Sequence, residues 1–235
     1  MLNDIRKGAL ANLPVAASVA AYGSVLGMMA AQKGVQWEAL LLMNLTIFAG
    51  SAQFVMVDMW VVPLPIAEIT MAVLIINLRY VLIGASLQPL FAGRTLIRKA
   101  TVMHFVADEN WAVTMAAHRS GGASIGFLFG GGLCLCLVWS LGTLLGHGAG
   151  VLIQHPERFA LDFAFIAVFT ALAVSMWRGR TDLAPWITAT ILAIVSAKLL
   201  PGKWYILIGG VGGALVPVFQ HHVKLLINRQ AYNNR

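Results

Sequence analysis

Glycine, polar and ionisable residues occur at three places inside or beside long apolar stretches of this sequence. They are Gly50, Ser51 and Gln53 in FAGSAQF (residues 48–54), Glu68, Asn77 and Arg79 in the run 68–87, and Asp108 and Glu109 in VADENWAV (residues 106–113). Lipid cannot hydrogen-bond an amide or stabilise a charge, so each such group needs another helix, an unwound backbone or a water-filled cavity. Ionisable groups in these positions are typical of substrate and ion pathways. The chemistry they favour is the reversible binding of a polar solute.

The composition is that of a membrane protein. Of the 235 residues, 59% are hydrophobic and 11% are charged, and the mean hydropathy is +0.81. Packed membrane spans leave little material for a soluble domain, so we expect one transmembrane domain over residues 1–235. The net charge of +7 is spread over short loops and termini rather than clustered with aromatic residues. This distribution favours loops that face an anionic lipid bilayer surface and argues against a nucleic-acid partner.

Seven apolar segments are long enough to cross a membrane, or nearly so. They are residues 13–31, 39–57, 61–87, 123–146, 161–177, 183–199 and 204–220. The sequence therefore predicts an all-α polytopic membrane protein with about seven transmembrane or partly re-entrant helices. The connection 88–122 carries so many charged and histidine residues that most of it is expected to lie in water.

The distribution of lysine and arginine argues against seven simple crossings. With the N-terminus in the cytoplasm, seven crossings would place the basic connection 88–122 outside, against the positive-inside tendency. If one element between residues 39 and 87 enters and leaves on the same side, every basic cluster becomes cytoplasmic. These clusters are Arg6 and Lys7; Arg94, Arg98, Lys99 and Arg119; Arg178 and Arg180; and Lys224, Arg229 and Arg235. We therefore expect a re-entrant or broken element.

The segment FAGSAQF is the best candidate for this break. Gly50 and Ser51 permit the close approach of a neighbour and weaken a helix locally. On an unbroken helix Ser51 and Gln53 would lie on different faces, so both faces would carry polar groups. An ordinary helix contact through small residues is the alternative interpretation. We expect a broken element around residues 48–54 that lines a cavity.

The run 68–87 gives a second reason to expect a break. Glu68 and Arg79 are eleven positions apart, about 16 Å along a continuous helix, so they cannot pair directly. Asn77 lies on the face opposite Glu68, so an unbroken helix cannot turn all three side chains towards one cavity. The alternatives are an Arg79 side chain that extends to the membrane surface and an interfacial Glu68.

Several motifs follow one another along the chain. They are LPVAASVAAYGSVLG in the first apolar segment, FAGSAQF, NLRYVLIGASL some twenty residues later, and VADENWAV. Their order and spacing resemble the AzlC family, the large membrane subunit of branched-chain amino-acid exporters. The resemblance covers most of the chain and fades after about residue 160, where LDFAFIAVF is the last similar segment. Tyr22 departs from the family pattern, in which a phenylalanine is expected before the glycine.

This resemblance implies a secondary transporter subunit that exports Val, Leu and Ile, with Met as a further candidate, across the bacterial inner membrane. It also implies a multi-pass protein that acts with a small hydrophobic AzlD-like membrane subunit. The energy is expected from an ion gradient, the proton gradient above all, because the sequence has no nucleotide-binding motif. A permease subunit for another small solute, dependent on a separate energising component, is the alternative.

Enzymes and cofactor proteins are disfavoured by the motifs. The sequence contains neither HExxH nor GxSxG, so we expect it not to be an enzyme. The histidines have no spacing typical of a metal site, so neither a metal nor a cofactor is expected. A channel would be expected to show a ring of charges or a carbonyl-lined signature, and neither is visible.

An amino acid needs a site for its carboxylate, its ammonium group and its apolar side chain. We expect N–H groups freed near Gly50 and Ser51 to hold the carboxylate, as the N-termini of half-helices do elsewhere. Arg79 would bind the same carboxylate or neutralise a buried acid. The expected substrate-binding residues also include Gln53 and Asn77, through hydrogen bonds, and Phe48 and Phe54, through apolar contacts.

Coupling to protons needs a group that changes its charge during transport. The candidates are Asp108 and Glu109, with Glu68 as a third. Adjacent carboxylates near His104 can perturb each other's pKa if they enter a cavity. The alternative is a solvated cytoplasmic loop in which Asp108 only caps the helix that begins around Glu109.

Overall fold

The computed structural model describes residues 1–153, 166–167, 170–171, 173–174, 177, 179–200 and 204–233, with side chains for all of these except 207 and 221–233. The helices, in chain order, are α1 (Leu2–Gln32), α2 (Trp37–Thr46), α3 (Gly50–Asp58), α4 (Ile66–Asn77), α5 (Arg79–Ser86), α6 (Gln88–Phe91), α7 (Leu96–His104), α8 (Asp108–Arg119), α9 (Ile125–Leu152), the short 3-10 helix η3 (Arg180–Asp182), α11 (Leu183–Leu199) and α12 (Trp204–Asn233).

The all-α class is confirmed, because the described residues form helices and no strands. Four stretches are long and apolar enough to cross a membrane, and a shorter apolar helix covers Trp204–Gln220. The four stretches are Leu2–Gln32, Ile66–Ser86, Ile125–Leu152 and Arg180–Leu199. Most of the predicted segment 161–177 lies outside the described residues. The protein is therefore a multi-pass membrane protein in which the predicted segment 39–57 is not one helix but two.

The chain divides into two compact units. Unit 1 contains Met1–Pro65 and Ile76–Val168, and unit 2 contains Ile66–Ile75 and Phe169–Arg235. The candidate site residues lie in unit 1, except Glu68. Within unit 2, α11 and α12 pack antiparallel through small residues, since a Cβ on Gly209 would meet the Ala189 carbonyl oxygen and one on Gly213 would meet the Pro185 carbonyl oxygen.

Two long parallel helices, α1 and α9, form the centre of unit 1. Glycines let their backbones approach closely: a Cβ on Gly8 would lie 1.9 Å from the Phe127 carbonyl oxygen, and one on Gly146 would lie 2.0 Å from that of Ser24. Without a hydrophobic force between helices in lipid, close packing of small residues is a main source of association. The apolar length of α1 and α9 and their glycine stripes therefore produce the scaffold on which shorter helices are placed.

A helical hairpin, α2–α3, follows α1. Ile47, Phe48 and Ala49 are not helical, and α3 begins at Gly50. The Lys33 Nζ donates to the Asp58 carbonyl oxygen at 3.0 Å, so the hairpin begins and ends near the C-terminal end of α1. The predicted broken element is confirmed, with its non-helical residues at 47–49, and its geometry is that of a re-entrant hairpin rather than a full crossing.

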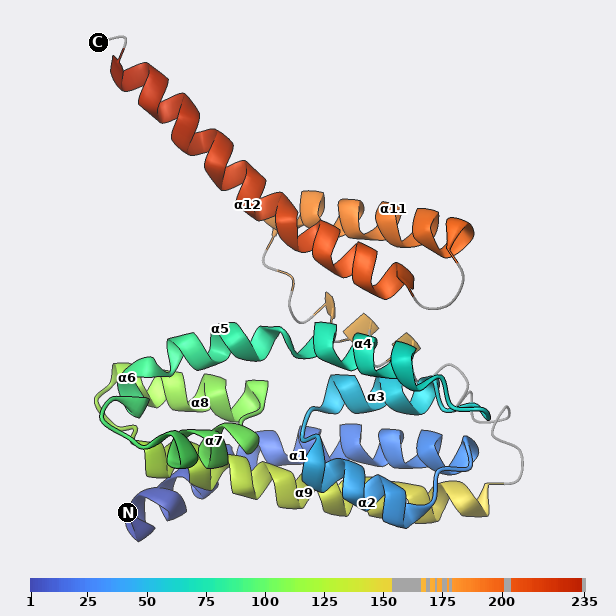
Figure 1. The fold of residues 1–235 in the computed structure, drawn as a ribbon. Helices are drawn as coiled ribbons and strands as arrows, with labels where there is room; N and C mark the ends of the chain where they lie inside the picture. Colours follow the sequence, from blue (N-terminus) through green and yellow to red (C-terminus); the bar gives the residue numbers. More distant parts are fainter. Residues whose placement is uncertain are drawn as a thin grey trace. The chain divides into compact units, whose positions relative to one another are not determined.

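A second hairpin, α7–α8, precedes α9. Phe105, Val106 and Ala107 separate its two helices. It begins near the N-terminal end of α1, where Arg98 Nη2 lies 3.5 Å from Met1 Sδ. After α8 the chain returns to this end, because Ser124 donates to Asp4 at 3.0 Å. The two hairpins therefore enter unit 1 from opposite ends, with their breaks directed towards each other (Figure 1).

The connection 88–122 is not one open loop, because it contains α6, α7 and α8. Phe91, Val102 and Val106 are buried in a cluster that also contains Ile83 and Leu128. Arg94 precedes α7, and the other charged residues of this segment lie on α7 and α8, two short helices whose apolar residues face α5 and α9. A helix of 9 or 12 residues is too short to be recognised by the roughly 20 apolar residues of a membrane span.

Candidate functional site where the two hairpins meet

Arg79 joins the two hairpins. Its Nη1 donates to Asp108 Oδ2 at 2.5 Å, and its Nη2 donates to Ser51 Oγ at 2.8 Å. The Arg79 and Asp108 side chains are 34% and 45% exposed, so the ion pair is partly buried. The two hairpins also contact each other directly, because His104 Nε2 lies 2.8 Å from the Leu45 carbonyl oxygen. One guanidinium thus contacts the first turn of both α3 and α8.

The N-termini of α3 and α8 both contribute partial positive charge to this site. The first helical hydrogen bond of α3 runs from the Gln53 N–H to Ala49, so the three N–H groups before it have no carbonyl partner within the helix. The same holds for α8, whose first bond runs from the Trp111 N–H to Ala107. Helix N-termini attract anions, and Arg79 adds a full positive charge between them. In the structure the carboxylate of Asp108 pairs with this charge. The same position can therefore bind the carboxylate of a ligand.

Arg79 and Asn77 retain polar atoms without a partner. The chain changes from α4 to α5 at Leu78, which keeps right-handed helical dihedral angles, so the run 68–87 is divided there without being unwound. The Arg79 Nε and the Asn77 Oδ1 are buried and make no hydrogen bond with the described residues. Buried polar groups are nearly always paired, so the free Arg79 Nε beside the ion pair is capacity for a ligand.

A buried chain of hydrogen bonds fixes α2–α3 on α9. Asn44 donates to Thr143 at 2.7 Å, Gln53 donates to Asn44 at 2.9 Å, and Trp139 Nε1 donates to Gln53 Oε1 at 2.7 Å. The Gln53 side chain is fully buried, and both its amide oxygen and its amide nitrogen have a protein partner. Phe54 packs edge-on against Trp139 with ring centroids 6.5 Å apart. These side chains hold the hairpin in place.

The matches to known proteins cover this site. The family model described as AzlC protein matches residues 14–153. The chain belongs to the AzlC family. The matched part of the chain includes both hairpins and α9, and with them every candidate residue of the site.

Relatives of this AzlC protein are membrane proteins of bacteria. The branched-chain amino acid transport protein AzlC of Bacillus subtilis is 23% identical over 83% of this chain and 76% of that protein. The inner membrane protein YgaZ of Escherichia coli is 25% identical over 91% of this chain and 89% of that protein. An uncharacterised membrane protein of Helicobacter pylori is 24% identical over 79% of this chain and 81% of that protein. No solved structure matches significantly.

Three of the ten residues that the sequence selected contact one another at the meeting point of the hairpins, and these are Ser51, Arg79 and Asp108. Gly50 precedes Ser51 at the start of α3, and Asn77 lies two residues before Arg79. Gly50 has to be small, because a Cβ there would lie 3.1 Å from Trp139. Phe48 lies in the break itself and is 9% exposed. Gln53 and Phe54 are buried, and both contact Trp139 of α9.

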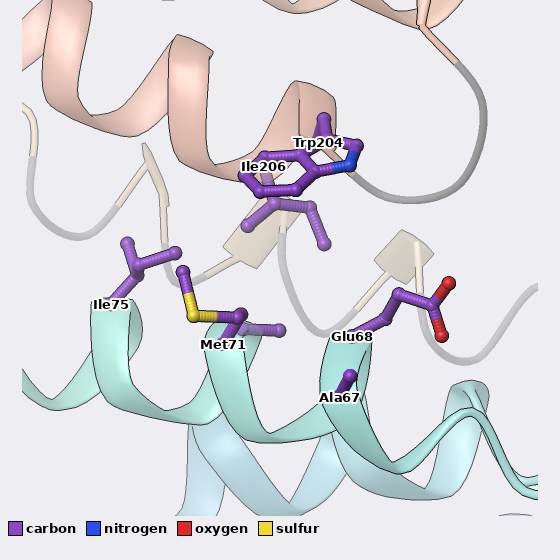
Figure 2. A pocket seen from close by; sticks show the side chains of 7 residues that line it. Ala67, Glu68, Met71, Ile75, Trp204 and Ile206 are labelled. Atoms are coloured by element: carbon purple, nitrogen blue, oxygen red, sulfur yellow. The ribbon is translucent and has the colours of Figure 1, made fainter.

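Glu109 and Glu68 have different positions. The Glu109 side chain is exposed on the first turn of α8. The cap of α8 is made by Asn110, whose Oδ1 accepts from the Ala107 N–H at 2.7 Å, so Asp108 is not the side chain that caps this helix. Glu68 belongs to unit 2, where it lines an apolar pocket with Met71 and Trp204, and its carboxylate points away from Met71 (Figure 2).

Sequence reasoning did not find the partners that α9 supplies. Trp139 and Thr143 lie within an apolar, glycine-rich helix and look like ordinary packing residues. Their polar atoms bond to residues 86 and 99 positions away. The one indication in the sequence was that Asn44 and Gln53 need hydrogen-bond partners inside the membrane. Thr143 and Trp139 of α9 are these partners.

Gln53→Leu is expected to destabilise the protein rather than to weaken substrate binding alone. The change leaves the Trp139 N–H and the Asn44 oxygen buried without partners, at about 1–3 kcal/mol for each group. Thermal unfolding in detergent measures this cost, and Gln36→Leu, at an exposed position, is the matched control. A Gln53→Leu protein that unfolds at the wild-type temperature but no longer binds leucine would contradict the structural role and restore the role of a ligand.

Proposed function

We propose that this chain is the large subunit of a secondary transporter that exports Val, Leu and Ile, with Met as a further candidate, across the bacterial inner membrane. The proton gradient drives the export, and a small AzlD-like membrane subunit completes the complex. Two findings support the proposal. The chain belongs to the AzlC family, and the Bacillus subtilis relative is named for branched-chain amino acid transport.

The observation that carries the proposal is the position of Arg79 between two half-helix N-termini. A substrate carboxylate at this point meets a guanidinium, first-turn N–H groups of α3 and α8 that have no carbonyl partner within their helix, and the hydroxyl of Ser51. Broken helices that direct their N-termini at an anionic group are a recurring design of transporter sites. The planar Arg79 fork and the N–H groups would fix the carboxylate, and Phe48 would lie beside the apolar part of the substrate.

The hairpins provide the two entrances that alternating access requires. The α7–α8 hairpin begins in the basic connection with Arg94, Arg98 and Lys99, so positive-inside orientation assigns it to the cytoplasmic side. The α2–α3 hairpin starts from the opposite end of α1 and is assigned to the outer side. Movement of either hairpin away from Arg79 would open the site to one side only. Asp108, on α8, would then exchange its contact with Arg79 for a contact with substrate or a proton.

Labelled leucine in preloaded proteoliposomes tests the proposal. The chain is reconstituted with and without a co-expressed small partner, under an imposed pH gradient and without ATP. We expect saturable efflux that follows the gradient and requires the partner. Folded protein that gives no efflux of leucine, isoleucine, valine or methionine in either preparation would contradict the proposal.

Leucine counterflow in the same vesicles distinguishes the proposed secondary transporter from a permease subunit that depends on another energising component. A secondary transporter catalyses leucine counterflow with no added energy source, because exchange needs only the site and its two conformations. A subunit that needs a motor would show neither counterflow nor gradient-driven efflux until that component is added.

A further inference from the structure

We propose that the substrate enters by opening the Arg79–Asp108 ion pair and replacing both of its contacts. The α-carboxylate of the amino acid takes Arg79, and the α-ammonium group takes Asp108. This inference rests on the proposed function and adds to it which side chains hold the two charged groups of the zwitterion. It gives Asp108 a role in substrate selection in addition to the coupling role expected from the sequence.

Charge balance is the first argument. In the structure Arg79 and Asp108 neutralise each other at 2.5 Å in a partly buried position. A ligand with only a carboxylate would leave Asp108 without its partner, and a ligand with only an amine would do the same to Arg79. Removing one member of a buried pair is strongly unfavourable. A zwitterion leaves both charges compensated, because it brings one group of each sign.

Available hydrogen-bonding atoms are the second argument. Arg79 keeps an unpaired, buried Nε, so a carboxylate can bind to it while Nη2 stays bonded to Ser51. The site therefore offers a buried, unpaired donor on the positive partner itself.

Size is the third argument. The carboxylate and ammonium groups of an α-amino acid are attached to one carbon atom, so they fit between two side chains that already touch. Ser51 and Asp108 hold two nitrogens of the same guanidinium, and the opening of the pair by the width of one small group admits this carbon. The side chain then extends away from the pair.

Three ligands with the same isobutyl group test the inference on the complex with its small partner. They are leucine, 4-methylpentanoate, which lacks the amine, and 3-methylbutylamine, which lacks the carboxylate. Displacement of labelled leucine from the wild type is expected to need at least about 100-fold more of either analogue, because a site that pairs with a group rejects ligands without it. Leucine that binds while 4-methylpentanoate competes equally would overturn the inference and leave the proposed function intact. Absence of leucine binding by folded wild type would overturn both.

The Asp108→Asn variant gives a gain-of-binding readout. Asparagine cannot neutralise an ammonium group and leaves Arg79 uncompensated, so labelled 4-methylpentanoate is expected to bind at least as well as leucine. The matched control is Glu38→Gln, at an exposed position of α2, which should keep the wild-type preference. An Asp108→Asn protein with an unchanged preference for leucine would overturn the inference. If Asp108→Asn binds neither ligand, Asp108→Glu decides: a kept leucine preference supports the role of the carboxylate, and a lost one opposes it.

Discussion

Leucine efflux is expected to fall by at least about 30-fold in Arg79→Lys and by about 1,000-fold in Arg79→Gln, because the lost charge contact is worth roughly 2–5 kcal/mol. Lysine keeps the charge but loses the planar fork that contacts Ser51 and Asp108 together. Glutamine also loses the charge and leaves Asp108 unpaired. Initial rates of efflux from proteoliposomes with equal amounts of each variant measure the effect.

The control for Arg79 is an arginine outside the site. Arg94 is exposed at the start of the basic connection, so Arg94→Lys and Arg94→Gln are expected to keep efflux within about twofold of wild type, as surface changes usually have small effects. Wild-type efflux by Arg79→Lys would show that the fork is not required. Wild-type efflux by Arg79→Gln would remove Arg79 from the site altogether.

Gly146→Val is expected to prevent the α1–α9 scaffold from forming. A Cβ at Gly146 would lie 2.0 Å from the Ser24 carbonyl oxygen and 2.5 Å from the Ser24 Cα, and backbone atoms cannot move aside as a flexible side chain can. Overpacking of this kind costs about 1–3 kcal/mol or more when the neighbour cannot shift. We expect little monodisperse protein in detergent and a large drop in the unfolding temperature.

Gly148→Val is the matched control on the same helix, because a Cβ at Gly148 meets nothing within 4 Å. Both variants exchange the same residues in α9, so their helix propensities change alike. Equal yields and unfolding temperatures for the two variants would contradict the close parallel packing of α1 and α9.

The sequence was sufficient for the first hairpin but not for the second. A glycine and a serine inside an apolar stretch, together with the basic residues after residue 88, predict a broken element that returns to its own side. The same basic residues made 96–119 look like a loop in water. Its helices are amphipathic and short. Their apolar faces can be recognised as buried surfaces only in the tertiary structure, where Val102 and Val106 belong to one cluster with Leu128.

The residues of the site were easier to select than their partners. Arg79 and Asp108 were chosen because charges near apolar stretches are costly without a role. Their pairing over 29 positions depends on how two hairpins meet, which no local pattern encodes. Gln53 was chosen for the same reason as Arg79, yet its amide bonds to Trp139 of α9. Polarity inside a membrane identifies groups that need partners and does not say whether protein or substrate provides them.

The most direct measurement of the central claim is the position of bound leucine in an experimental structure of the complex with its small partner. We predict leucine between α3 and α8, with its carboxylate on Arg79, its ammonium group on Asp108, and the direct Arg79–Asp108 contact broken. Leucine found elsewhere, for example in the unit 2 pocket beside Glu68 and Trp204, with the Arg79–Asp108 pair intact, would contradict the claim.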